Sequence, residues 1–488
     1  MLEEQSFLKA IIWAYTANWG EKAFSALFFV ILASLLGPRD FGIVSMAMIY
    51  VAFLAMFLDQ GFASALIQRK NLEHGHLDAV FVANLVLSFG LVILGFSLSH
   101  AWAVLNGTPE LEIVSSVLSL SIVIRALTLV QTAILMREMN FRSLSIRTNF
   151  SVLLSGIVGI LMAYAGWGLW SLVYQRLLAE AIALILLWKM SSWRPSFSFS
   201  WPRLNDLMGF SLGNFAAQLA LFFDAQAGSL VLGILFGPAA VGLYKVADRI
   251  TGTVTTMVVA SIQSASFPQF SRLQDKPDEL RKSVLMCVQM SASVSLPTLA
   301  GLAATSDPLM ATIGPNWIPA SDALKVLCGF GLAIVLTCFT VPLMQACGRT
   351  RQVAVLEWAR TIAGLILVVA AGLLFRDSSV QAQVLSIASA RVIVMGLIVT
   401  PIFLFLLLKL AALSLHDLVM SVVPSILSSI VVVASVAFAG HLMPLGTKPI
   451  IALGVEVFAG GILGLAVLLR TDPQLRSSAT KMLRMLGA

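Results

Sequence analysis

The sequence predicts an all-α polytopic membrane protein of about fourteen transmembrane helices, arranged as two six-helix lobes in parallel repeat with two extra C-terminal helices. Three observations lead to this fold class. Of the 488 residues, 59% are hydrophobic and 11% are charged, whereas roughly a quarter are charged in soluble globular proteins. The chain contains fourteen apolar segments of about spanning length. A Gly-Pro turn near its start also returns later in the chain.

The repeated turn indicates a duplication. The stretch 35–42 (Leu-Leu-Gly-Pro-Arg-Asp-Phe-Gly) returns in weaker form as 236–242 (Phe-Gly-Pro-Ala-Ala-Val-Gly). A Gly-Pro pair between two helices is ordinary by itself, because proline ends a helix and glycine permits a tight reversal. The two copies, however, occupy equivalent places in two blocks of six predicted helices, which is typical of parallel repeats. The recurring positions are Gly37, Pro38 and Gly42, matched by Gly237, Pro238 and Gly242.

The apolar segments define the predicted spans in order. Residues 2–13 are amphipathic and are expected to lie at the membrane interface, and the first span serves as the insertion signal without a cleaved signal peptide. The spans are 14–36, 41–66, 78–101, 112–135, 146–166, 168–189, 207–235, 241–268, 282–304, 320–346, 353–375, 380–408, 418–440 and 449–469.

The distribution of Lys and Arg predicts the orientation. Alternate loops, together with both termini, hold twenty of these residues, whereas the other set of loops holds three. The excess places both termini in the cytoplasm and both Gly-Pro turns outside. A proline-containing basic segment at 191–206 is then a cytoplasmic linker. The predicted domains are a lobe at 1–190, this linker, a second lobe at 207–408, and two additional helices with a tail at 409–488.

Catalytic and metal-binding motifs are missing from the sequence. There is no Gly-Lys-Ser/Thr phosphate loop, no metal-binding histidine pair and no serine nucleophile motif. The four cysteines lie in apolar segments without metal-ligand spacing, and the net charge of +7 comes from loop residues that orientation explains. The sequence therefore predicts no catalytic residue, cofactor, metal or nucleic-acid partner, and hence no enzyme.

Charged residues inside the spans carry the functional signal, because an ionisable side chain in hydrocarbon normally faces a protein interior or a watery cavity. A cavity lined by Arg and Lys suits an anionic cargo such as a diphosphate. Pairing within one helix is the structural alternative, for Arg176 with Glu180, Glu357 with Arg360 and Asp322 with Lys325. The candidate substrate-binding residues are Arg125, Arg391, Lys245, Arg249, Arg176 and Arg360, of which we favour the first four as cavity-lining.

Several blocks of the chain resemble a known family. They are 31–42 (Ile-Leu-Ala-Ser-Leu-Leu-Gly-Pro-Arg-Asp-Phe-Gly), 58–70, 135–142, the Gly-Pro-Asn-Trp-Ile-Pro-Ala turn at 314–320, and Gln-Ala-Cys-Gly-Arg at 345–349. Across about residues 10–375 the chain is similar to bacterial polysaccharide transporters, the lipid-linked oligosaccharide or O-antigen flippases of the multidrug/oligosaccharidyl-lipid/polysaccharide exporter superfamily. It departs from the pattern at Ala239 and Ala240, where the first turn has Arg39 and Asp40.

The resemblance implies two lobes forming a V around a central cavity. It implies transfer of an undecaprenyl-diphosphate-linked oligosaccharide from the inner to the outer leaflet of the bacterial inner membrane, for exopolysaccharide or lipopolysaccharide synthesis, driven by H⁺ or Na⁺. Asp224, Asp59 and Glu180 are then the candidate ion-coupling residues, with helix-packing hydrogen bonds as the alternative for the two aspartates. The implied partners are the lipid-linked sugar, membrane lipids, a polysaccharide polymerase and glycosyltransferases.

Two other function classes are weighed against the flippase. A drug exporter of the same superfamily should show acids unmatched by cations in its spans, and here the two are roughly balanced. A membrane polymerase or glycosyltransferase would need substantial outer loops to hold polar catalytic groups, and the predicted outer loops are short. The longest of them is expected at 305–319.

Overall fold

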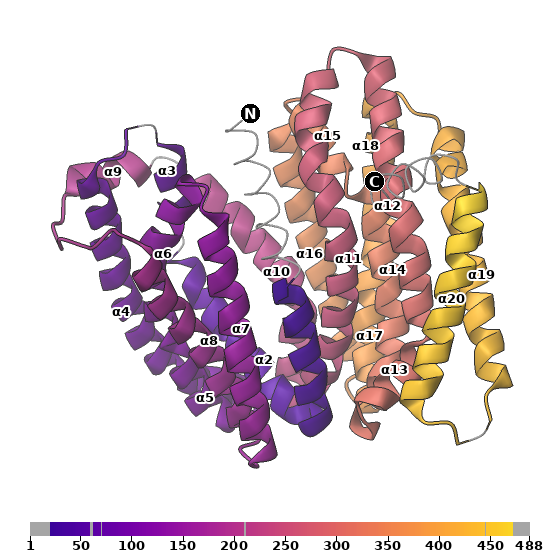
Figure 1. The fold of residues 1–488 in the computed structure, drawn as a ribbon, viewed down its shortest axis with the longest axis horizontal. Helices are drawn as coiled ribbons and strands as arrows, with labels where there is room; N and C mark the ends of the chain where they lie inside the picture. The colour runs from indigo at the N-terminus through magenta and orange to yellow at the C-terminus, as the bar shows by residue number, and fades with distance from the viewer. Residues whose placement is uncertain (1–19, 59–61, 70, 209–210, 445, 472–488) are drawn as a thin grey trace, which may run out of the picture. The chain divides into compact units, whose positions relative to one another are not determined.

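A computed structural model describes residues 20–58, 62–69, 71–208, 211–444 and 446–471, with a few side chains in these ranges left undescribed (Figure 1). The described residues contain twelve helices long and apolar enough to cross a membrane, and each falls on one of the fourteen predicted spans. The two remaining spans, 14–36 and 241–268, coincide with a helix over residues 20–35 and with α11 (Pro238–Leu273). The chain is therefore an all-helical, multi-pass membrane protein, and its helices are compatible with the predicted number of spans.

Internal contacts divide the chain into two compact units, Met1–Gly242 and Leu243–Ala488. The lobe boundary expected at 191–206 stays a prediction. After residues 20–35, unit 1 contains α2 (Pro38–Met56), α3 (Phe62–Gln68), α4 (His74–Leu105), α5 (Glu110–Ser119), α6 (Ser121–Arg137), α7 (Phe141–Tyr164), α8 (Leu169–Met190), α9 (Trp201–Met208), α10 (Ser211–Phe236) and the first turn of α11. After α11, unit 2 contains α12 (Pro277–Ala304), α13 (Ser306–Ile313), η1 (Pro315–Ala320), α14 (Ser321–Thr337), α15 (Thr340–Ala346), α16 (Thr350–Leu374), α17 (Val380–Ile393), η2 (Val394–Val399), α18 (Thr400–Leu410), α19 (Leu415–Leu442) and α20 (Pro449–Thr471).

Two sequence expectations about local structure are wrong. The span expected at 41–66 is not one helix, because α2 ends at Met56 and α3 begins at Phe62. The intervening sequence contains Asp and Gly, which are poor helix formers. The outer loop expected at 305–319 is largely helical, since α13 and the 3-10 helix η1 occupy it. Asp307 in the first turn of α13 favours that helix, and Pro315 opens the next one.

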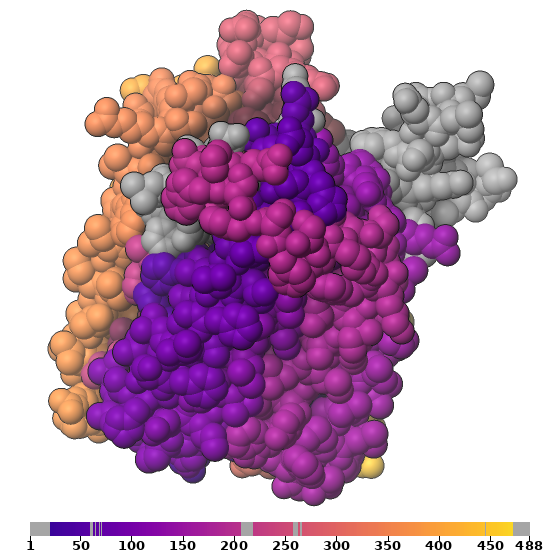
Figure 2. Space-filling model, turned by 90° about the vertical axis from the view of Figure 1, so that its left-hand side faces the viewer, coloured from indigo at the N-terminus to yellow at the C-terminus, as the bar shows by residue number. Residues whose placement is uncertain are grey.

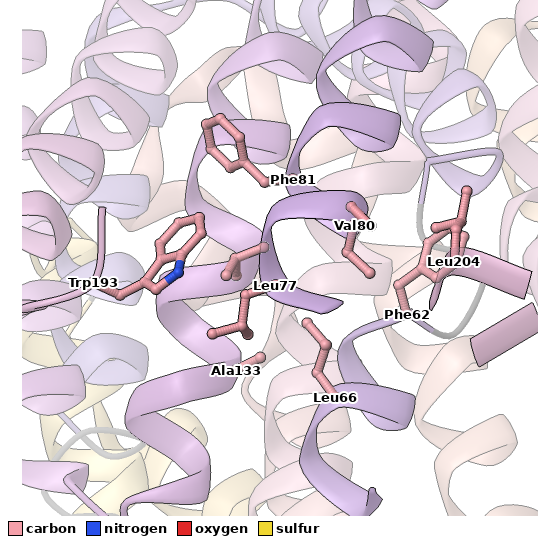
Figure 3. Packing of buried hydrophobic residues seen from close by; sticks show 10 residues of the cluster. Phe62, Leu66, Leu77, Val80, Phe81, Ala133, Trp193 and Leu204 are labelled. Carbon is pink, nitrogen blue, oxygen red and sulfur yellow. The ribbon is translucent and has the colours of Figure 1, made fainter. Parts of the chain in front are cut away.

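The predicted linker packs against unit 1. Trp193 and Leu204 are buried with residues of α3, α4 and α6, and Figure 3 shows them on opposite sides of the start of α4. In Figure 2 the magenta surface of α9 lies beside the indigo surface of α3, with which it is in contact. The buried carboxylate of Asp78 accepts hydrogen bonds from the backbone N–H of Ser196 (3.1 Å) and from the hydroxyls of Ser196 and Ser198. The linker is thus fixed by apolar packing and by one buried acid.

The two C-terminal helices pack within unit 2. α19 packs between α12 and α20, with the hydroxyls of Ser293 and Ser425 3.2 Å apart and the Ser428 hydroxyl donating to the Gly464 carbonyl at 2.9 Å. Small polar residues and glycine allow helices in a membrane to approach closely. A capping box at Ser414 and Asp417 starts α19, and Asp417 also accepts a 2.6 Å bond from Arg281 of α12.

Candidate functional site

A charged cluster within unit 2 is the main candidate site. Arg391 projects from α17, and its Nη1 donates to the Tyr244 hydroxyl at 2.6 Å and to Asp248 Oδ1 at 3.0 Å, both on α11. The guanidinium carbon lies 4.5 Å from the centre of the Phe330 ring of α14, within the range of a cation–π contact. The Arg391 side chain is 11% exposed. Three helices therefore hold one arginine in a defined position.

Lys245 completes this cluster. Its Nζ lies 3.9 Å from Asp248 Oδ2, so that the two oxygens of one carboxylate face two different cations. Two positive groups thus share this negative group, and the three side chains together carry an excess of positive charge. The π-helical segment η2 begins three residues after Arg391. Such segments interrupt the regular ladder of hydrogen bonds and are frequent at functional sites.

Two other candidate cations are paired within their own helices, as the spacing allows. Arg176 Nη2 lies 2.6 Å from Glu180 Oε1 on α8, and Arg360 Nη2 lies 2.8 Å from Glu357 Oε2 on α16. The third pair from the sequence also forms, with Lys325 Nζ 3.3 Å from Asp322. These contacts support a structural contribution from each pair.

Arg125 and Arg249 have exposed side chains on α6 and α11. In the part of the chain that the structure describes, Arg125 has no ion-pair partner and no side-chain hydrogen bond. An exposed guanidinium in a spanning helix is costly in lipid, so its position requires water, headgroups or a ligand nearby.

The candidate coupling acids differ in their surroundings. Asp224 is half-buried on α10, directly after Phe222 and Phe223, whose rings lie 5.8 and 6.5 Å from that of Phe53 on α2. Glu180 accepts from Arg176 through Oε1, and its buried Oε2 has no hydrogen-bond partner among the described residues. Asp59 lies outside the residues that the structure describes.

Sequence reasoning missed the partners of Arg391. Neither Tyr244 nor Asp248 is among the candidate residues named from the sequence. Asp248 and Arg391 are 143 positions apart, so helical spacing gives no signal for their contact. The available signal in the sequence was Tyr244, which lies one turn before Asp248 in an apolar helix and is buried in the structure.

Comparison with known proteins gives a family match and several relatives. The family model described as polysaccharide biosynthesis protein matches residues 31–322. The chain is 28% identical to the succinoglycan biosynthesis transport protein ExoT of Rhizobium meliloti, over 71% of this chain and 70% of ExoT. It is 25% identical to the teichuronic acid biosynthesis protein TuaB of Bacillus subtilis, over 58% of this chain and 59% of TuaB. It is 22% identical to the lipopolysaccharide biosynthesis protein WzxC of Escherichia coli, over 62% of each chain.

Solved structures share the fold. The lipid II flippase MurJ in an inward closed conformation superposes with a TM-score of 0.69 at 14% identity, covering 94% of this chain and 99% of MurJ. An inward-facing multidrug resistance transporter of the MATE family gives a TM-score of 0.61 at 18% identity, covering 82% of this chain and 98% of that chain. At these identities the likeness concerns the fold alone.

Proposed function

Because the chain belongs to the polysaccharide biosynthesis protein family, we propose that it is a flippase for an undecaprenyl-diphosphate-linked oligosaccharide. It moves this lipid from the inner to the outer leaflet of the bacterial inner membrane, for exopolysaccharide or lipopolysaccharide synthesis, and it catalyses no chemical reaction. Both termini and the 191–206 linker face the cytoplasm. Residues 1–190 and 207–408 form the two lobes.

The family match carries this proposal, and the charged cluster of unit 2 supports it. A diphosphate headgroup needs cations that are held in place but not fully neutralised. Arg391 is held in place by the Tyr244 hydroxyl and by Asp248, and Lys245 lies beside the same carboxylate. The arginine fork binds phosphate oxygens in bidentate fashion, and lysine adds a point charge. Arg125, Arg249, Arg176 and Arg360 are proposed as further contacts along the path.

An ion gradient drives the cycle in this proposal. Asp224, Glu180 and Asp59 are the acids that would take up H⁺ or Na⁺ in one state and lose it in the other. For Asp224 the proposal is directly testable, since Asp224→Asn should abolish the dependence of transport on the gradient. Transport by this variant that kept its full gradient dependence would remove Asp224 from the mechanism.

The decisive experiment uses the purified full-length protein in liposomes. A fluorescent undecaprenyl-diphosphate saccharide is incorporated, and an impermeant quencher reports its appearance in the accessible leaflet, with an imposed H⁺ or Na⁺ gradient and with none. We expect protein-dependent movement that Arg391→Gln slows. Movement of an organic cation instead of the lipid-linked saccharide would favour the drug exporter, the second candidate with this fold.

A further inference from the structure

The two Gly-Pro turns of the duplicated sequence touch each other within unit 1. A Cβ atom built on Gly42 would lie 2.5 Å from the carbonyl carbon of Pro238, and one built on Gly242 would lie 2.7 Å from the carbonyl carbon of Pro38. In both cases the carbonyl oxygen is closer still. Each glycine therefore accommodates the proline carbonyl of the other turn. We call these four residues the reciprocal glycine contact.

The surrounding geometry fixes this contact at the helix starts. The first backbone bonds are equivalent, since Phe41 N–H donates to the Gly37 carbonyl and Val241 N–H to the Gly237 carbonyl, each at 3.4 Å. α10 packs against α2 near the same place, where a Cβ on Gly233 would be 3.0 Å from the Met46 side chain.

The contact is close but weak. Backbone lies directly on backbone, so the attraction consists of dispersion and Cα–H···O contacts, each worth under about 1 kcal/mol. A Cβ on either glycine would collide with main-chain atoms, which cannot rotate away as a side chain can.

We infer that the reciprocal glycine contact is the closed outer gate of the transporter, made of main chain rather than of side chains. The inference rests on the proposed flippase function and on the topology that places both turns outside. The turns meet when the outer side is closed and separate when the headgroup is released. Because the contact needs two glycines, a methyl group at either one should favour the open state.

Cysteine accessibility tests the gate without any transport assay. Met46 is buried one turn inside Gly42, so Met46→Cys is placed in the full chain after the four native cysteines are replaced by alanine. An impermeant maleimide is added to intact cells, and labelling is divided by that of the denatured protein. Gly42→Ala and Gly242→Ala should each raise the labelling rate at position 46 about tenfold, which corresponds to a bias of about 1.4 kcal/mol. Gly37→Ala and Gly90→Ala are the matched controls, because a Cβ there meets nothing within 4 Å.

The double variant makes the test sharper. Once one methyl group separates the turns, the second should add little, so the Gly42→Ala/Gly242→Ala protein should label like either single variant. Unchanged labelling in both single variants, or loss of both proteins from the membrane, would show a packing role and overturn the gate. Faster labelling of the variants, together with no movement of lipid-linked saccharide by the unsubstituted protein, would keep the gate and refute the proposed function. Normal transport with unchanged labelling would support the proposed function and overturn the gate.

Discussion

Replacing Asp248 by Asn should strengthen the binding of a diphosphate, because the carboxylate competes with that ligand for Arg391 and Lys245. A charge pair about 4 Å apart is worth about 4 kcal/mol at an effective dielectric constant of about 20. Desolvation and the partial exposure of these side chains reduce the net value to about 1.5 to 3 kcal/mol. Removing the competitor should therefore tighten binding by about ten- to a hundredfold.

The assay is titration of the purified protein with inorganic pyrophosphate at fixed ionic strength. The variant should bind pyrophosphate more tightly and unfold at a lower temperature, because two neighbouring cations lose their shared counter-ion. Asp322→Asn is the matched control: its partner Lys325 also lies 2.9 Å from Asp307, so one cation serves two acids there. Lower stability of the Asp248→Asn protein with unchanged pyrophosphate affinity would refute the reasoning and leave Asp248 a purely structural partner.

Three further predictions concern other parts of the molecule. Export per molecule should fall in the order Arg, Lys, Gln at Arg125, with a loss of about ten- to a hundredfold for Gln at unchanged membrane abundance; normal export per molecule with low abundance would instead show a structural role. An impermeant thiol reagent in intact cells should label a cysteine at Ala239 but not one at Ser198, and the opposite pattern would invert the topology. Asp78→Asn should weaken the hold on the linker by about 1 to 3 kcal/mol, so that limited proteolysis of inside-out vesicles cuts residues 191–206 several-fold faster; equal rates would show that apolar packing alone holds the linker.

The spans could be predicted because their cause is local. A run of about twenty apolar residues must form a helix in a bilayer, where unpaired backbone groups are too costly. The pairs Arg176–Glu180 and Glu357–Arg360 were predictable for the same reason, since three or four positions on one helix bring two side chains together. Interruptions of the regular α-helix within a span were harder to predict. The π-helical segment at Val394–Val399 lies in an apolar run that gives no sign of it.

Contacts between distant helices could not be predicted from one sequence. Arg391 has no acid nearby in the chain, which indicated a cavity-lining residue, yet the fold brings Asp248 to it. The linker shows the same limit. The sequence predicts a linker at 191–206, but it gives no sign that Ser196 and Ser198 bind the buried Asp78. In both cases the sequence does not tell which segments of the chain pack against each other.

The reciprocal glycine contact also bears on the origin of the chain. When residue i of one copy meets residue j of the other, and j meets i, the interface is isologous, which is the arrangement of a twofold homodimer. Each half of this duplicated chain therefore carries a self-complementary patch at its Gly-Pro turn. A single six-helix protein with that patch could pair with its own copy before the genes fused. The two turns are not identical in backbone conformation, since Gly237 has a φ of 84° where Gly37 has −81°.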